Sequence, residues 1–143
     1  EVELVDTVYL VAYFKPSDPL HEEARKALEN LSKDRKISQP ALVEFDLLMK
    51  ARNVKLEQRL KAWLLLSSLT GPESVEPLLL EDFAVAAYLE EKEGMDYFDS
   101  LVAAQCIVRG AKPLTTDEKV LEAVERREEV LEGFSLLRKK CKL

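Results

Sequence analysis

The stretch YFDSLVAAQCIVRGAKPLTTDEKV (residues 97–120) combines an apolar helix, a glycine stop and a short strand that runs directly into an acid. The helix begins at Tyr97 and closes at Gly110, since a glycine just past the last periodic residue fits a left-handed cap. The strand predicted at 112–116 follows at once and leads into Asp117. This order of elements favours a helix that crosses over to a parallel strand, with a carboxylate at the strand's carboxyl end.

The same helix carries a second acid, Asp99, that local structure does not explain. At about 100° per residue, Asp99 lines up with Val102, Ala103 and Cys106 on a helix that is apolar nearly all round. A carboxylate on a buried face is costly to desolvate unless another group pairs with it. We therefore interpret Asp99 as part of a site that holds a metal ion together with other acids.

Outward from this stretch, short strands alternate with helices along the chain. Strands are predicted at residues 2–5, 36–38, 74–80, 112–116 and 130–137. Helices are predicted at residues 8–14, 21–31, 41–52, 56–70, 81–93, 97–109 and 118–127. This alternation is typical of βαβ units, in which helices cover both faces of a parallel sheet. The expected fold class is α/β, with three α/β/α layers and a short central parallel sheet.

Two acids stand where such sheets bind ligands, just outside the carboxyl ends of the strands. Asp6 follows the first strand, and Asp117 follows the strand at 112–116. Both, like Asp96, also occupy plausible N-cap positions, where aspartate is favoured for hydrogen bonding alone. For each acid taken singly, the capping role remains open as an alternative.

The fourth acid, Glu44, is selected by helical geometry. Its helix places Glu44 on the stripe formed by Ala41, Leu47, Leu48 and Ala51. Asp46 points about 160° away from that stripe and is expected to be solvated. Glu44 could instead reach solvent at the helix start, so this reading also has a structural alternative.

The residue types decide the expected chemistry. Four carboxylates in one crevice would repel one another and raise each other's pKa. Oxygen-only ligands suit Mg²⁺ or Mn²⁺, which keep waters and bind a substrate's phosphate. One or two such ions can activate a water and stabilise the leaving oxygen in phosphodiester cleavage. Nothing in the sequence indicates nucleophilic catalysis, and there is no Gly-rich phosphate loop.

Composition sets the outer bounds. The 143 residues correspond to one domain, with 47% hydrophobic and 34% charged residues. The net charge of −6 argues against an overall electrostatic attraction of the protein to nucleic acid, but not against binding through a local basic strip. Cys106 and Cys141 fit neither a disulfide framework nor a zinc site. No apolar run has the length of a membrane span, and we expect a cytoplasmic protein with no membrane contact.

These segments together resemble a PIN domain, the fold of VapC-type toxin ribonucleases. VELVDTVYLVAYF (2–14) resembles the family's opening strand, with the first acid at Asp6 and the usual small hydroxyl residue at Thr7. DPLHEEARKAL (18–28) is similar to the second helix. PALVEFDLL carries the second acid at Glu44.

The stretch quoted first resembles the family's most specific pattern, a tyrosine-rich turn, an aspartate and small apolar residues before T-x-D. That places the third acid at Asp99 and the fourth at Asp117, with Thr115 or Thr116 in support. Asp96 is a further nearby acid, which could substitute for Asp99 or merely cap the helix.

The resemblance implies a PIN-like α/β/α fold over residues 1–137, followed by a basic tail at 138–143. It implies hydrolysis of RNA with Mg²⁺ or Mn²⁺ held by the four acids, which would be both the catalytic and the metal-binding residues. It also implies a homodimer and, for VapC-like members, inhibition by a small antitoxin protein.

Contact with RNA is expected from local basic patches. The segment KARNVKLEQRLK contains four candidates, Lys50, Arg52, Lys55 and Arg59. The tail, from Arg138 to Lys142, is a second candidate. Either patch could equally be only a solvated face.

Two other functions remain in consideration. One is a PIN-fold module that binds RNA or protein without catalysis, which a metal-dependent cleavage assay would distinguish. The other is a phosphate-accepting receiver domain, which needs paired acids after its first strand. VDTVY offers only Asp6 there, so this alternative ranks low.

Overall fold

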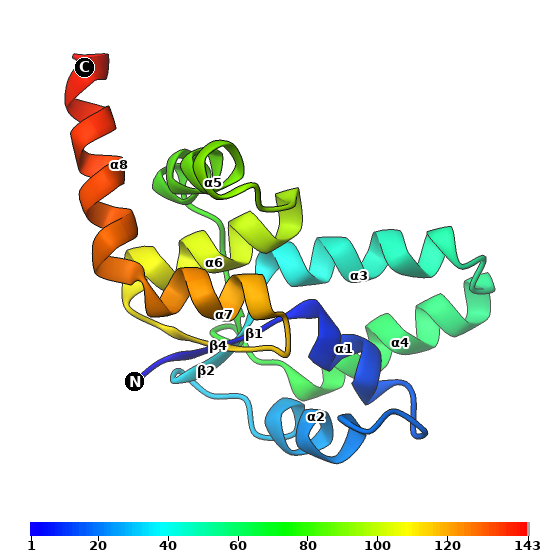
Figure 1. Ribbon diagram of the computed structural model, residues 1–143. Coiled ribbons are helices and arrows are strands. Elements are labelled where there is room, and N and C mark those ends of the chain that lie inside the picture. Colours follow the sequence, from blue (N-terminus) through cyan, green and yellow to red (C-terminus); the bar gives the residue numbers. More distant parts are fainter. Residues whose placement is uncertain (143) are drawn as a thin grey trace.

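A four-stranded parallel sheet lies at the centre of the computed structural model, which describes residues 1–142 (Figure 1). The strand order is β3-β2-β1-β4, and every pair is parallel. The strands are β1 (Glu3–Val5), β2 (Arg35–Ser38), β3 (Val75–Glu76) and β4 (Lys112–Leu114). The expected α/β class with a short central parallel sheet is therefore confirmed.

Eight helices surround this sheet within the described residues. They are α1 (Thr7–Tyr13), α2 (His21–Leu28), α3 (Gln39–Ala51), α4 (Leu56–Leu69), α5 (Leu80–Glu93), α6 (Tyr97–Arg109), α7 (Glu118–Glu125) and α8 (Arg127–Cys141). None of them has the length and apolar content that a membrane span requires.

Adjacent residues of the central strand face opposite cores, as expected for a sheet covered on both sides. Val5 of β1 joins Ile37 of β2 in a core with α1, α2, α3 and α4. Leu4 contacts Cys106 of α6 on the other face. Cys106 is fully buried and serves as a small residue of this core. Both faces of the sheet are thus sealed, and the polar site lies at its carboxyl edge.

Local signals set the ends of α5 and α6 as predicted. Gly94 and Gly110 terminate the two helices with φ values of 66° and 67°. These left-handed conformations exclude most side chains, so glycine is needed at both positions.

Two sequence expectations are wrong. Residues 130–137, predicted as a last strand, belong to α8, which continues through Arg138, Lys139 and Lys140 as its last turn. A short apolar run of this kind fits a strand as well as a helix, but Val130 packs in a core with α5 and α6, and a helix satisfies its own backbone. The boundary at 137 between domain and tail stays a prediction, and residue 143 lies outside the described residues.

The second correction concerns the buried stripe of α3. The buried line runs through Ala41, Phe45 and Met49, whereas Leu47 is 48% exposed. Residues four apart lie on one face of a helix, and this buried face of α3 packs in the core that α1, α2 and α4 share. Glu44 and Leu48 lie on the neighbouring face of α3 and line the adjacent pocket instead. Glu44 is therefore beside the core rather than in it.

A buried ion cluster joins α5, α6 and β3. The Arg109 guanidinium donates to both carboxylate oxygens of Asp82, at 2.7 and 2.8 Å, and also pairs with Glu76. Asp82 is completely buried, and the Arg109 side chain is 16% exposed. We call these three residues the arginine cluster. It fixes α6 and α5 to the edge strand of the sheet.

Candidate active site

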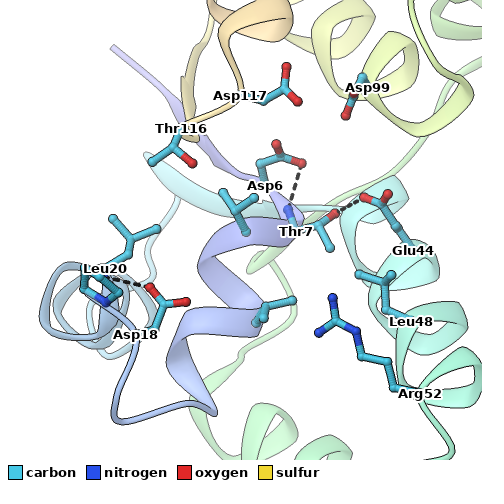
Figure 2. Close-up of a pocket in the computed structure, with 13 residues that line it drawn as sticks. Asp6, Thr7, Asp18, Leu20, Glu44, Leu48, Arg52, Asp99, Thr116 and Asp117 are labelled. Atoms are coloured by element: carbon cyan, nitrogen blue, oxygen red, sulfur yellow. Dashed lines mark hydrogen bonds between the residues drawn. The ribbon is translucent and has the colours of Figure 1, made fainter.

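Four carboxylates from four separate segments line one pocket at the carboxyl edge of the sheet, with a volume of about 630 Å³. Figure 2 shows Asp6 at the centre, with Asp99 and Asp117 beyond it and Glu44 to one side. They come from the end of β1, from α3, from the first turn of α6 and from the start of α7. The four acids selected from sequence are thus brought together.

Asp6 is held in place by the elements around it. It is the N-cap of α1, where its Oδ1 accepts a hydrogen bond from the Thr7 backbone N–H at 2.7 Å. Its Oδ2 accepts from the Thr115 hydroxyl, also at 2.7 Å. The capping alternative is therefore true of Asp6, but the cap leaves its carboxylate lining the pocket at 3% exposure.

Glu44 is oriented by a hydroxyl from another element. The Thr7 Oγ1 donates to Glu44 Oε1 at 2.5 Å, across the gap between α1 and α3. Thr7 itself is buried, which restricts its rotamers and gives Glu44 a fixed partner. Asp46 lies outside the pocket and pairs with Lys50 at 2.9 Å.

Asp117 and Asp99 complete the pocket from the other side. Asp117 is the N-cap of α7, and its Oδ1 accepts from the Val120 N–H at 3.0 Å. The Thr115 hydroxyl accepts from the Asp117 N–H, so one threonine organises both Asp6 and Asp117. Asp99 is half-buried in the first turn of α6, and its carboxylate accepts no hydrogen bond within the described residues.

The electrostatics of the pocket are those of crowded acids. Burial raises the pKa of Asp6 and of Glu44, against the opposing effect of their threonine hydrogen bonds. Burial, followed by the charges of Asp117, Asp6 and Glu44, raises the pKa of Asp99 to about 7. The pKa of Asp99 rises further than those of Asp6 and Glu44, because desolvation and like charges act on Asp99 with no hydrogen bond to oppose them.

Within residues 1–142, no lysine, arginine or histidine forms an ion pair with these four acids. The donors are all oxygens, which suits a hard cation such as Mg²⁺ or Mn²⁺. In the same part of the chain, no three histidine, cysteine, aspartate or glutamate side chains are already placed to hold a metal ion. The donor set fits such an ion chemically.

The other predicted residues divide between the pocket and its surroundings. Thr116 lines the pocket. Asp96 is exposed at the N-cap of α6 without a side-chain capping bond, and its charge contributes to the raised pKa of Asp99. Of the basic candidates, Arg52 lines the pocket, whereas Lys55 and Arg59 do not. Lys50 is engaged with Asp46.

Sequence reasoning missed a fifth acid of the pocket, Asp18. Its Oδ1 accepts from the Leu20 N–H at 2.8 Å and shapes the turn before α2. The Asp-Pro dipeptide at 18–19 is a turn signal that could have drawn attention to it. Nothing local indicated that the turn would reach the acid pocket.

Comparison with known proteins concerns the family of the chain. The model of the PIN domain family matches residues 4–127, a span that contains all four acids. None of the curated proteins matches the chain. The PIN domain is a nuclease-type fold, commonly found in metal-dependent ribonucleases. Because the match covers most of the chain, this protein belongs to the PIN domain family.

Proposed function

We propose that this protein is an endoribonuclease that hydrolyses RNA phosphodiester bonds with Mg²⁺ or Mn²⁺. The observation that carries the proposal is the convergence of Asp6, Glu44, Asp99 and Asp117 in one pocket, where none of them forms an ion pair with a cation of the described residues. Such an arrangement is unfavourable for the fold alone, because unpaired like charges in a partly desolvated site destabilise it. A bound cation that also contacts a phosphate group would neutralise these charges.

The proposed reaction adds water across one P–O bond of the RNA backbone. The water oxygen attacks phosphorus, the ester P–O bond breaks, and the departing oxygen gains a proton while the water loses one. A divalent ion held by the four acids would supply an activated water and charge stabilisation of the leaving oxygen. Thr7 and Thr115 hold Glu44 and Asp6 in fixed orientations by hydrogen bonding. RNA as substrate would place this activity in the cytoplasm.

A cleavage assay tests the proposal directly. Purified protein is incubated with labelled RNA in chelator, in Mg²⁺ and in Mn²⁺, and fragments are resolved by size. We expect cleavage only with added metal, and its loss in the Glu44→Gln variant. Metal-independent cleavage, or activity that survives Glu44→Gln, would contradict the proposal and indicate a contaminating nuclease or another site.

We further propose a VapC-like role, as the toxin of a toxin–antitoxin pair. The support is the order and spacing of the sequence segments that resemble that subgroup. A neighbouring open reading frame for a small DNA-binding protein would favour the pair, and co-expression of its product should relieve growth inhibition by this chain. If expression of the active chain does not slow growth, the toxin role fails, whereas the nuclease proposal does not depend on it.

A homodimer is proposed from the same resemblance and from exposed apolar side chains. Leu80 and Phe83 of α5 are 89% and 43% exposed, and Val43 and Leu47 of α3 are each 48% exposed. Exposed apolar side chains of this size are available for burial between two copies of the chain. Light scattering on the purified chain measures its mass in solution, and a monomer across the micromolar range would contradict this proposal.

One observation favours a second candidate, a binding module that uses the same fold without catalysis. No metal site is preassembled within residues 1–142, so ligation requires the acids to approach each other. If Mn²⁺ neither stabilises the protein nor supports cleavage while RNA still binds, the binding module is the better description.

A further inference from the structure

A second cavity continues from the acid pocket along α1, α3 and α4. Val11, Leu48 and Arg52 line both cavities, so the two are adjacent. The second has a volume of about 530 Å³, within the range of about 300–1,000 Å³ that suits small organic groups. We call it the trough, and define it by Val11, Lys15, Leu48, Arg52, Lys61 and Leu65.

The charge of the trough is opposite to that of the protein. Its lining includes three cations, Lys15, Arg52 and Lys61, and no acid, although the chain has a net charge of −6. None of the three forms an ion pair in the described part of the chain, whereas several other cations do. Unpaired cations gathered in one place are available for an anionic ligand.

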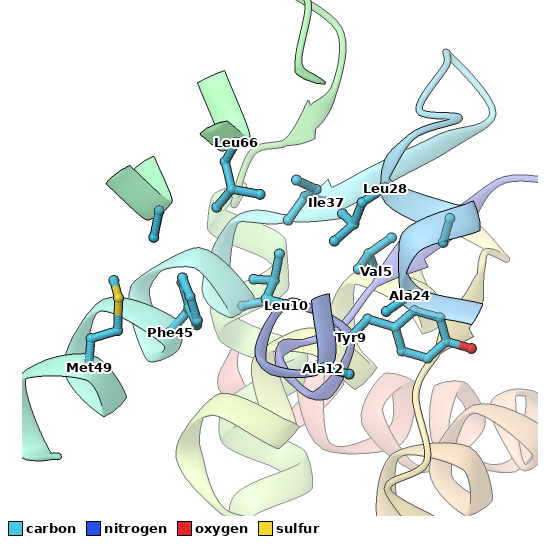
Figure 3. Close-up of a cluster of buried hydrophobic side chains, with 13 residues drawn as sticks. Val5, Tyr9, Leu10, Ala12, Ala24, Leu28, Ile37, Phe45, Met49 and Leu66 are labelled. Atoms are coloured by element: carbon cyan, nitrogen blue, oxygen red, sulfur yellow. The ribbon is translucent and has the colours of Figure 1, made fainter. Parts of the chain in front are cut away.

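The floor of the trough is apolar. Phe45 and Met49, which Figure 3 shows extending from α3 in the core cluster, line it from below at 4% and 7% exposure. Leu65 of α4 is 43% exposed at the rim. A ligand that matches this surface carries both flat apolar groups and repeated negative charges.

We propose that the trough binds the single-stranded RNA that flanks the scissile phosphate, an inference that rests on the ribonuclease function proposed above. Backbone phosphates contact Lys15, Arg52 and Lys61, and an unpaired base lies on the apolar floor. The RNA is single-stranded because bases in a duplex are stacked and paired, and cannot reach such a floor. Figure 2 shows the Arg52 side chain on the same side of the acid pocket as Glu44 and Leu48. Arg52 also lines the trough, so it would hold the phosphate next to the cleaved bond.

Charge reversal with a matched control tests this assignment. The trough variant is Lys15→Glu/Lys61→Glu, and the control is Lys26→Glu/Lys33→Glu, which makes the same charge change at exposed positions outside both cavities. Binding of a fluorescent single-stranded RNA and of the same sequence as a duplex is measured in chelator over a range of salt. Unchanged melting temperatures establish that both variants are folded.

We expect the trough variant to bind single-stranded RNA about tenfold more weakly than the control at low salt. The slope of the logarithm of its binding constant against the logarithm of salt concentration should become shallower by about 1.4, because each of the two lost phosphate contacts with a single strand contributes about 0.7. A third variant, Leu65→Gln, should bind single-stranded RNA more weakly than the parent does. Its binding of inorganic polyphosphate, which has no bases, should be unchanged. Equal effects in trough and control variants, or equal affinity of the parent for duplex and single strand, would overturn the inference.

Cleavage measured on the same variants separates this inference from the proposed function. If the parent cleaves and the trough variant cleaves equally well at subsaturating RNA, the trough serves another ligand, such as an acidic protein segment, and the inference fails alone. If the parent binds RNA through the trough but never cleaves it with Mn²⁺ or Mg²⁺, the proposed ribonuclease function fails and the RNA-binding trough stands.

Discussion

Two clusters of buried charge in this protein are built in opposite ways. The arginine cluster places Arg109 between Asp82 and Glu76, so each charge has a partner. The acid pocket gathers Asp6, Glu44, Asp99 and Asp117, and none of the four forms an ion pair with a cation among the described residues.

This difference in charge pairing indicates that the arginine cluster stabilises the fold and that the acid pocket binds a ligand. A desolvated charge with a bidentate partner is compatible with stability, and removal of the partner is strongly destabilising. Desolvated charges of one sign destabilise the fold unless a ligand neutralises them. The pKa values of Asp6, Glu44 and Asp99 are raised first by burial and further by the neighbouring acids, as expected in that second situation. The predictions below test the contrast, starting with the largest effect.

Removal of the shared cation from the arginine cluster should have the largest effect on stability. Arg109→Leu leaves Asp82 buried without its partner, which should lower the free energy of unfolding by about 3–5 kcal/mol. Arg25→Leu on α2 is the control, because its pairs with Glu22 and Glu29 are exposed and worth at most about 1 kcal/mol. Urea titrations of both variants measure this. Similar small losses would mean that the arginine cluster is not essential to the fold.

Removal of one carboxylate from the acid pocket should instead affect activity. Glu44→Gln should lower the cleavage rate by about a hundredfold or more, because even residues behind metal ligands contribute about 10–100-fold. Asp46→Asn, two residues away on the outer face of α3, should leave the rate nearly intact. Single-turnover cleavage with Mn²⁺ measures both. Equal losses would place the reaction outside the pocket.

The same chemical change should have opposite effects on stability in the two clusters. Without metal, Asp99→Asn should raise the melting temperature by a few degrees, because it removes a repulsive charge and opens no cavity. Asp82→Asn should lower it, because Arg109 loses its main partner. Thermal melts in chelator test the two signs. If both variants melt below the parent, Asp99 has a structural role and the contrast fails.

Metal should reverse the effect at Asp99. Preferential binding to the folded parent stabilises it by about 2.7 kcal/mol at a hundredfold excess of ion over its dissociation constant. Asp99→Asn should gain much less from millimolar Mn²⁺. An equal shift in both proteins would indicate that Asp99 does not ligate the ion.

The last expected effect is a pH dependence of the metal-free stability, which solvent screening reduces because Asp99 is only half-buried. The pKa of Asp99 is about 7 in the folded state, against 3.8 for its ordinary value, so the folded protein holds a proton that the unfolded chain has released. Stability should therefore fall as pH rises from about 4 to about 7, and then level off. Melting temperatures in chelator across this range should show a weaker slope for Asp99→Asn. Identical slopes would assign the titration to other acids.

Much of the site was predictable from residues close together in sequence. Asp6 and Asp117 follow strands, and strand ends lie at the ligand-binding edge of a parallel sheet. Gly94 and Gly110 end their helices through their own backbone conformations. These features depend on local periodicity and on single-residue conformational freedom, which the sequence expresses directly.

The sequence by itself therefore determined the α/β alternation, the ends of α5 and α6 and the choice of the four acids that share the pocket. Only the tertiary structure decided which charges are paired. Arg109 meets Asp82 across 27 residues, and Thr7 meets Glu44 across 37, so no local pattern could assign these partners. It likewise decided that residues 130–137 form part of α8 and that Lys15 and Lys61 share one trough. Pairing and burial depend on distances between elements that are remote along the chain, and these distances exist only once the layers have packed.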